Sequence, residues 1–252
     1  MQPLLSDELP RRRGSRLAFF GGSFDPPHLG HLAIARAARD AFHLDTVLFA
    51  PVGMQPLKPG GSAASFEDRA AMTRLAIEGE PGFAISLADA PKPSESHKAV
   101  PNYTIDALEK LSSTLAPNSV LYCLVGADSF FGMSRWHRAA EIPFAATLIV
   151  AWRPGQSLES LREALPQGLE LEPAPGGDKI ESGIEVRAFL LVSSSGDRAP
   201  FYVLPGLDVE ISASEIRAGL HQTAGALLSS PGERSLLPPR VAGYIRSHNL
   251  YS

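Results

Sequence analysis

The chain has 252 residues, 44% of them hydrophobic, which is long enough to bury the core of a large domain. The formal net charge of −4 argues against bulk electrostatic attraction to nucleic acid or to a membrane surface. Any binding of phosphate must therefore depend on a small group of residues at one site. No stretch is long and apolar enough to span a bilayer. The single cysteine, Cys123, lies in an apolar run; this excludes a disulfide or a cysteine metal site within the chain and favours a reducing, cytoplasmic location.

The first predicted elements are a leader and a buried strand. Residues 1–15 have no signal-peptide profile and are predicted to form a disordered or loosely packed leader. Residues 17–20 are a short apolar run typical of a buried parallel strand, and Gly21 and Gly22 follow at once. We therefore expect the chain to leave this strand in a sharp turn.

A helix is predicted after Pro26 and Pro27, because apolar residues then recur at helical spacing and proline suits a helix entrance. Its N-terminus faces the end of the strand, where backbone N–H groups and the helix dipole favour an anion. His28 and His31 project from the same side and can donate hydrogen bonds to phosphate oxygens. A glycine turn alone, or two histidines alone, is commonly only a turn or a solvated pair. Together they predict a nucleoside triphosphate site.

Strand and helix then alternate. Strands are predicted at 46–50, 83–87, 120–125 and 147–151, and helices after a Ser65 cap and over 105–115. This order predicts an α/β fold with a Rossmann-like, doubly wound parallel sheet. Ligands bind beyond the carboxyl ends of such strands, where the glycine turn, Gly126-Ala127-Asp128 and Arg153-Pro154-Gly155 are expected to collect.

The last part of the chain is predicted to complete one domain over 16–252. Residues 155–200 are interpreted as an insertion or a lobe margin, with a strand at 184–192, and a final strand is predicted at 201–204. Ser212 or Ser214 is expected to cap a short helix beginning near Glu215. Val241, Ile245 and Leu250 indicate a packed helix, so we predict a C-terminal helical portion.

Two segments carry a family resemblance. Residues 21–31 resemble the first signature of the adenylyltransferases that share the His-x-Gly-His element with class I aminoacyl-tRNA synthetases, and residues 211–217 resemble their second, Ile-Ser-Ser-Thr-x-x-Arg. The chain is similar to the nicotinate-nucleotide adenylyltransferases in particular, through Pro56-Leu57-Lys58, Arg69 with Met72, residues 102–108, Gly126-Ala127-Asp128, Trp136, Arg153-Pro154-Gly155, Tyr244-Ile245 and Leu250-Tyr251. The resemblance implies transfer of the adenylyl group of ATP to nicotinate mononucleotide, giving nicotinic acid adenine dinucleotide and pyrophosphate in NAD biosynthesis.

The resemblance also implies roles for individual residues. The 5′-phosphate of the mononucleotide attacks the α-phosphorus of ATP directly, so positioning and charge neutralisation carry the catalysis. His28, His31, Lys58 and Arg217 are expected to act on the triphosphate, and Mg²⁺ to be held mainly by the ATP phosphates rather than by a protein metal site. The remaining ATP contacts are expected at Gly21, Gly22, Ser23, Phe24, Gly126, Asp128, Ile211 and Ser212. Asp128 binds a ribose hydroxyl or caps the following helix.

The acceptor site is expected at Asp25, Tyr103, Thr104 and Trp136. Trp136 offers a flat face for a pyridine ring, and Thr104, with backbone N–H groups at a helix start, can receive the nicotinate carboxylate. The alternative is that Trp136 packs against Phe130 or Phe131 and that Thr104 is only a helix cap. His137 is expected either to assist binding near the acceptor or to be an exposed side chain.

The chain departs from the family pattern in three places. Leu57 stands where the family often has histidine, Ala213 and Ser214 replace serine and threonine, and the segment between Arg153 and Ile211 is longer. Ser214 keeps a hydroxyl, so the second signature is expected to keep its anion site.

Three other functions compete with this one. An adenylyltransferase for nicotinamide mononucleotide or phosphopantetheine shares the ATP motifs. A dinucleotide-dependent oxidoreductase is disfavoured, because the turn lacks Gly-x-Gly-x-x-Gly and the strand at 46–50 ends without an acidic ribose ligand. A non-catalytic nucleotide-binding protein is disfavoured by the retention of both histidines, Lys58 and Arg217. No nucleic acid or membrane partner is expected, and a homo-oligomer is compatible with the sequence.

Overall fold

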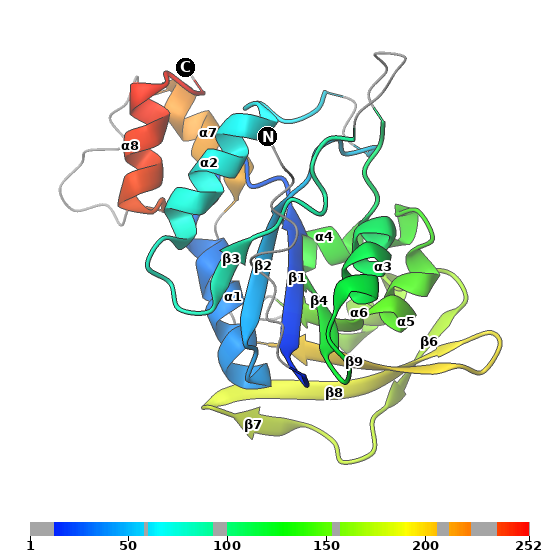
Figure 1. The fold of residues 1–252 in the computed structure, drawn as a ribbon. Helices are drawn as coiled ribbons and strands as arrows, with labels where there is room; N and C mark the ends of the chain where they lie inside the picture. Colours follow the sequence, from blue (N-terminus) through cyan, green and yellow to red (C-terminus); the bar gives the residue numbers. More distant parts are fainter. Residues whose placement is uncertain are drawn as a thin grey trace.

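The fold is built on one twisted sheet with helices on both faces (Figure 1). It comes from a computed structural model that describes residues 13–57, 60–92, 100–152, 157–205, 212–222 and 236–251. Six strands run parallel in the order β3-β2-β1-β4-β5-β9. Their bounds are β1 Arg16–Gly22, β2 Thr46–Pro51, β3 Phe83–Ile85, β4 Val120–Gly126, β5 Thr147–Ala151 and β9 Arg198–Leu204. The predicted parallel α/β sheet is confirmed, with β3 shorter than the predicted 83–87.

The strands are continuous apolar runs because both faces of the sheet are covered. Leu17 and Phe19 of β1 point into one core, and Ala18 and Phe20 point into the other. Helix α1 (Leu29–Phe42) packs on the second of these faces. The opposite face is covered by α3 (Thr104–Thr114), α4 (Ala127–Phe131), α5 (Ile142–Ala145) and α6 (Leu158–Glu163), with the short 3₁₀ turns η1 (Met133–Arg135) and η2 (Ala139–Glu141) between them. The doubly wound arrangement is therefore confirmed.

The predicted C-terminal helices, α7 (Ala213–Gln222) and α8 (Pro239–Ser247), pack with α2 (Phe66–Ile77) in a third core beside the sheet, and we call these three helices the helical portion. They lie together at the upper left of Figure 1. Met72, Ile216 and Val241, one from each helix, are buried in it. The predicted Ser65 cap is confirmed, since its hydroxyl accepts a hydrogen bond from the N–H of Asp68 at 3.0 Å. Helix α8 ends at Ser247, so Leu250 packs from the turn that follows the helix.

Residues after α6 extend the sheet with antiparallel strands, which the sequence did not predict. Strand β8 (Ile184–Ser193) pairs antiparallel with β9, and β6 (Leu169–Pro173) and β7 (Lys179–Glu181) pair antiparallel with β8. The reason lies in the short link between β8 and β9, where Gly196 adopts a φ of +87°. A link this short can join only antiparallel strands. The strand predicted at 184–192 is confirmed, and in the described part of 155–200 the chain continues the sheet.

The start of the chain is tied to the sheet before β1 begins. The leader predicted over 1–15 falls mostly on residues 1–12, which lie outside the described residues. Ser15 is buried, and its carbonyl accepts a hydrogen bond from the N–H of Val120 at 2.8 Å. The N–H of Gly14 donates to the carbonyl of Pro117 at 3.2 Å. Gly14 and Ser15, which the prediction placed in the leader, are therefore hydrogen-bonded to the rest of the fold.

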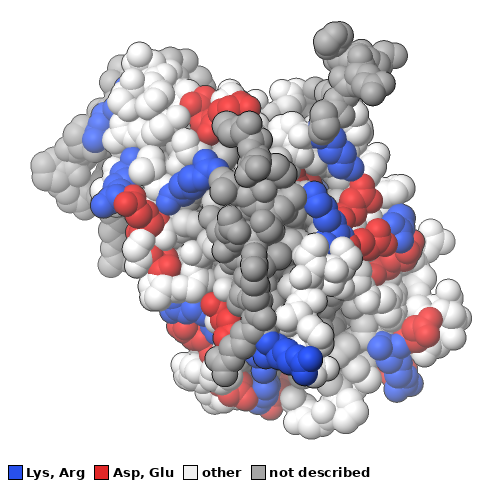
Figure 2. All heavy atoms as spheres, in the orientation of Figure 1, with Lys and Arg blue, Asp and Glu red and all other residues white. Residues whose placement is uncertain are grey.

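The charged side chains of opposite sign are interleaved on the surface. Figure 2 shows Lys and Arg beside Asp and Glu across one face, and ion pairs such as Lys92 with Asp106 (2.9 Å) and Arg138 with Glu109 (2.8 Å) account for part of this pattern. On the face drawn, no wide basic area appears among the described residues. This distribution agrees with the local phosphate site expected from the net charge.

Candidate active site

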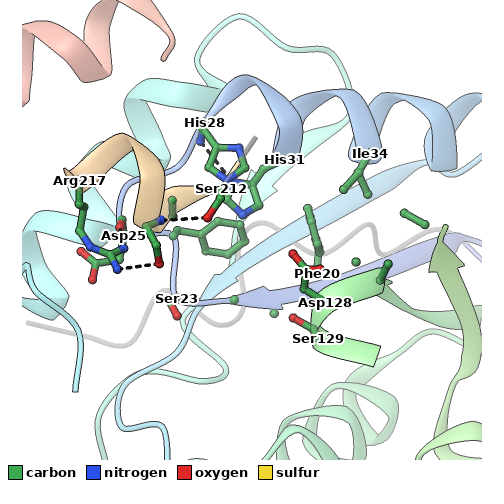
Figure 3. A pocket seen from close by; sticks show the side chains of 18 of the residues that line it. Phe20, Ser23, Asp25, His28, His31, Ile34, Asp128, Ser129, Ser212 and Arg217 are labelled. Atoms are coloured by element: carbon green, nitrogen blue, oxygen red, sulfur yellow. Dashed lines mark hydrogen bonds between the residues drawn. The ribbon is translucent and has the colours of Figure 1, made fainter. Parts of the chain in front are cut away.

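A pocket of about 340 Å³ opens at the carboxyl ends of β1, β4 and β5 (Figure 3). It lies at the topological switch point of the sheet, where β1 and β4 are neighbours and the chain has crossed from one half to the other. Its wall is formed by the end of β1 with the loop that follows, the first turn of α1, the start of α4, the end of β5 and the first turn of α7. Its lining comprises Phe20, Gly21, Gly22, Ser23, Phe24, Asp25, His28, His31, Ile34, Gly126, Ala127, Asp128, Ser129, Ala151, Trp152, Ser212, Ala213, Ser214 and Arg217.

Gly21 and Gly22 are the last two residues of β1 and pair with Ala50 and Pro51 of β2, so the sharp turn predicted at these glycines is wrong and the chain turns after Gly22. Close packing favours glycine at both positions. A Cβ on Gly21 would lie 2.8 Å from the ring of Phe19, and one on Gly22 would lie 3.3 Å from the ring of Phe24. Phe24 is 1% exposed and holds a left-handed φ of 48°, which places its ring edge-on against Phe20 at 5.6 Å. The rings below the turn thus fix the backbone that borders the pocket.

The N-terminus of α1 offers fewer free donors than expected. The N–H of Leu29 donates to the carbonyl of Leu236 at 3.0 Å, and the N–H of His28 donates to Nδ1 of His31 at 3.2 Å. The helix dipole still points at the pocket, but the side chains of the first turn provide much of the donor set.

His28 and His31 lie side by side with ring centroids 3.7 Å apart and ring planes tilted by 31°. Because Nδ1 of His31 accepts a backbone hydrogen bond, the proton of the neutral ring lies on Nε2, which is then a donor. His28 is 6% exposed, and its Nδ1 is buried with no hydrogen-bond partner among the described residues. Burial lowers the pKa of His28 to about 4. Burial, and secondarily the neighbouring His28, also lower the pKa of His31 well below its usual value. Both rings are therefore neutral donors at pH 7.

Arg217 is the cation that the described residues place in this pocket. Its Nη1 donates to the backbone carbonyl of Asp25 at 2.6 Å, and its Nη2 donates to Oγ of Ser214 at 3.1 Å (Figure 3). These bonds orient the guanidinium and use two of its five N–H groups, so others remain for an anion. The hydroxyl of Ser212 accepts the N–H of Ser214 at 3.3 Å. The predicted residues Lys58 and Ile211, and the segment Arg153-Pro154-Gly155, lie outside the described residues.

Asp25 borders the pocket, but its carboxylate is engaged inside the protein. It is 4% exposed, and its oxygens accept hydrogen bonds from the N–H groups of Ala63 (2.7 Å) and Ala64 (3.1 Å) and from the hydroxyl of Tyr251 (2.7 Å). This arrangement fits an anchor of the loop better than the acceptor contact that we expected.

Arg69 supports the same turn from below and was quoted in the sequence only as a mark of resemblance. Its guanidinium donates to the carbonyls of Ser23 (2.6 Å), Val52 (2.8 Å) and Ala64 (3.3 Å), and the residue is 2% exposed. Burial lowers its pKa, with nearby acidic groups such as Asp25 acting in the opposite direction. Arg69 thus joins the loop after β1 to the end of β2 and to the start of α2.

The other residues expected at the acceptor site lie together, outside the pocket. We call Tyr103, Thr104, Trp136 and His137 the acceptor region. The rings of Tyr103 and His137 are 4.4 Å apart, and Tyr103 and Trp136 both pack against the core that contains Phe130. Tyr103 is the N-cap of α3 and Thr104 its first residue, so the alternative of Thr104 as a cap is wrong. None of the four lines the pocket.

Sequence reasoning missed several pocket residues. Trp152 follows β5 directly and packs against Phe131, with ring centroids 5.3 Å apart. Ile34 lies one helical turn after His31, on the same face of α1. Both positions could have been found, the first from the rule that ligands bind at carboxyl strand ends and the second from helical spacing. Ser129 and Ala151 are further examples.

The described residues also bear on the predicted metal, cysteine and membrane properties. Among the described residues, no three His, Cys, Asp or Glu side chains gather as a metal ion would require. Cys123 is buried in β4, as predicted, and burial raises its pKa to about 12. No helix in the described ranges is long and apolar enough to cross a membrane.

Comparisons with known proteins agree on one family. The family model described as cytidylyltransferase-like matches residues 19–219. A probable nicotinate-nucleotide adenylyltransferase of Gloeobacter violaceus is 35% identical over 238 residues, covering 94% of this chain and 97% of the relative. One of Trichlorobacter lovleyi is 34% identical over 236 residues, covering 94% and 99%.

Solved structures share the fold. A Plasmodium falciparum nicotinic acid mononucleotide adenylyltransferase complexed with NaAD aligns with a TM-score of 0.59 at 18% identity, covering 94% of this chain and 97% of that one. The same protein complexed with APC aligns with a TM-score of 0.61 at 17% identity, with the same coverage. At this identity the likeness supports the Rossmann-like fold.

Proposed function

The chain belongs to the nicotinate-nucleotide adenylyltransferase family, and we propose that it transfers the adenylyl group of ATP to nicotinate mononucleotide, giving nicotinic acid adenine dinucleotide and pyrophosphate in NAD biosynthesis. One observation carries the proposal beyond family membership. The pocket at the switch point combines two neutral, adjacent histidines with an oriented arginine beside the two tightly packed glycines that end β1. These groups donate hydrogen bonds and supply positive charge where a triphosphate would lie.

ATP is the occupant that this pocket suits. With ATP bound, Nε2 of His31, the ring of His28 and the remaining N–H groups of Arg217 would face phosphate oxygens, with Ser212 and the two glycines at the end of β1 beside them. The start of α4 and Trp152 would border the nucleoside, and Asp128 would receive a ribose hydroxyl. Lys58 and Ile211 complete this proposed set from the family resemblance alone. The cavity volume of about 340 Å³ lies within the range of small-molecule sites.

The reaction requires no nucleophile from the protein. The acceptor phosphate attacks the α-phosphorus of ATP, the bond to the bridging oxygen breaks, and pyrophosphate leaves with the electron pair. His28 and His31 do not supply charge at pH 7, because burial lowers the pKa of both rings. Their hydrogen bonds stabilise oxygens that gain negative charge in the transition state, and Arg217 supplies the formal charge.

Magnesium fits this pocket as a companion of the phosphates. The Asp25 carboxylate already accepts three hydrogen bonds from the protein, and no cluster of metal ligands occurs among the described residues. The lining instead offers mainly N–H and O–H donors, which suit phosphate oxygens. Mg²⁺ carried by ATP would neutralise the leaving pyrophosphate.

The acceptor region is the proposed site for the pyridine nucleotide. Trp136 and Tyr103 supply aromatic surface, and the first N–H groups of α3 at Thr104 can receive a nicotinate carboxylate. Since the acceptor region does not line the ATP pocket, the acceptor would extend from it so that its phosphate reaches the triphosphate. We further propose a single domain over 16–252 and a cytoplasmic location, the latter from the buried free thiol of Cys123.

One assay tests this proposal. Purified protein is incubated with Mg-ATP and either nicotinate or nicotinamide mononucleotide, and the dinucleotide product is identified by mass spectrometry. We expect faster use of the nicotinate form. Preference for the amide would retain the ATP site and overturn the acceptor assignment. Absence of dinucleotide with either would contradict the proposed function.

A further inference from the structure

The turn that follows α8 is held in a costly conformation. The N–H of Leu250 donates to the carbonyl of Ile245 at 3.1 Å, and the N–H of Asn249 donates to that of Arg246 at 3.4 Å. These are the two bonds of a Schellman motif, in which the position of Asn249 is usually glycine. Asn249 has a φ of 50°, and Tyr251 has a φ of 62°. Two non-glycine residues in the left-handed region indicate that the surroundings impose the geometry of this turn.

This geometry buries Tyr251 and directs its hydroxyl toward Asp25, in the loop after β1. Tyr251 is 8% exposed and packs in the core of the helical portion. Its hydroxyl donates to Oδ1 of Asp25 at 2.7 Å. Burial first, and then the bond to the charged Asp25, raise the pKa of Tyr251, so the phenol stays a donor at every physiological pH. The sequence separation between the two partners is 226 residues.

Asp25 links Tyr251 to Arg217 in the pocket. Its carboxylate binds Ala63, Ala64 and Tyr251, while its backbone carbonyl accepts the guanidinium of Arg217 at 2.6 Å. Asp25 therefore connects the loop after β1 to the entrance of α2, to the turn after α8 and to Arg217. A shift of this residue moves the carbonyl that orients Arg217.

We propose that Tyr251 is a positioning residue for nucleotide binding. Its hydroxyl holds Asp25, and through Asp25 it holds the guanidinium of Arg217, in the orientation that receives the triphosphate. The inference rests on the proposed function only in naming ATP as the ligand. The contact is remote from the reacting atoms, so Tyr251 acts through its neighbours.

The chain provides a matched control in Tyr244. The hydroxyl of Tyr244 donates to Oδ1 of Asp68 at 3.0 Å, so it also joins the α8 segment to an acidic residue near the start of α2. Asp68 does not line the pocket and makes no bond to Arg217. Tyr244→Phe thus removes a tyrosine–aspartate hydrogen bond of the same chemistry from the same C-terminal segment, without touching Asp25.

The experiment compares Tyr251→Phe and Tyr244→Phe with the wild type in steady-state kinetics. We expect Tyr251→Phe to raise KM for ATP by about tenfold, with KM for the acceptor changed by less than about twofold, since a mispositioned Arg217 weakens phosphate binding. A purely structural role would lower the folded fraction, which reduces kcat and leaves both KM values unchanged. Tyr244→Phe is expected to keep both KM values.

A binding measurement keeps the inference separate from the reaction. Affinity for a non-hydrolysable ATP analogue with Mg²⁺ is measured by calorimetry for the three proteins, and folding is checked by circular dichroism. If the wild type binds the analogue but makes no dinucleotide, the proposed function fails, and weaker binding by Tyr251→Phe still supports this inference. Equal affinity of the wild type and Tyr251→Phe overturns it, as does an equal loss in Tyr244→Phe. Should Tyr251→Phe unfold, Tyr251→Met, whose flexible apolar side chain can fill the buried site and has no donor, is tested in the same way.

Discussion

The pocket and the acceptor region are built in different ways, although both lie on the same α/β scaffold. The guanidinium of Arg217 and the loop beside it in the pocket are oriented by a buried hydrogen-bond network of Asp25 and Arg69. Acceptor-region side chains such as Trp136 and Tyr103 are held mainly by packing against the core beneath them. Hydrogen-bonded networks fix an orientation, whereas packed aromatic faces adapt to a flat ligand. The difference indicates that precise geometry is required at the triphosphate and less at the acceptor ring.

The largest effect is expected from His31→Ala. The change removes Nε2–H from the pocket and also frees the N–H of His28, so we expect roughly a thousandfold lower kcat/KM with the fold intact. The measurement is dinucleotide formation at saturating and limiting ATP. His43→Asn, at an exposed histidine on the turn after α1, is the control. Normal turnover of His31→Ala would remove the proposed role of this residue.

The pH dependence of stability tests the burial of His28. Its pKa is about 4 when folded and 6.5 in the reference state, so above pH 6.5 the ring is neutral in both states and adds nothing. As pH falls from 6.5 toward 4 the unfolded chain takes up the proton first, and stability falls by about 3 kcal/mol at pH 4. Urea unfolding of the wild type and of His28→Gln between pH 6.5 and pH 4 measures this loss of stability. Parallel curves for the two proteins would show that His28 is not desolvated.

Arg217→Lys is expected to have a smaller effect. Lysine keeps the charge but cannot bind the Asp25 carbonyl and Ser214 Oγ through a planar fork while also facing a phosphate. We expect about a thirtyfold loss in kcat/KM, mostly through KM for ATP. The control is Arg240→Lys, because Arg240 pairs with Glu78 on the outer surface of the helical portion. A similar loss in both variants would mean that charge alone matters.

The smallest effect is expected in the acceptor region. Trp136→Leu removes the aromatic face and is expected to raise KM for the mononucleotide about tenfold, with KM for ATP unchanged within about twofold. Separate titrations of the two substrates measure this. If KM for ATP rises instead, the acceptor region and the ATP pocket are not separate binding sites, and the comparison fails.

Local patterns accounted for much of the fold. The apolar run of β1, the cap at Ser65 and the spacing of α1 each predicted an element that the structure contains. Part of the pocket lining followed from the two glycines after the first predicted strand and from the second signature, because short motifs at strand ends and helix starts converge in a parallel sheet.

The features that could not be predicted from the sequence depend on contacts between residues far apart in the chain. The bond between Tyr251 and Asp25 joins residues that no local pattern relates, and the antiparallel strands β6 and β7 have weak alternation and mostly exposed or half-buried residues. The neutrality of the histidine pair also follows from burial by distant segments and not from spacing.

The central claim is that ATP lies in the pocket and is oriented by the Asp25 network. The most direct measurement is a crystal structure of the protein with a non-hydrolysable ATP analogue and Mg²⁺. We predict that the phosphates contact His28, His31 and Arg217, and that the bonds from Arg217 and Tyr251 to Asp25 persist. An analogue whose phosphates lie away from these three side chains would contradict the account.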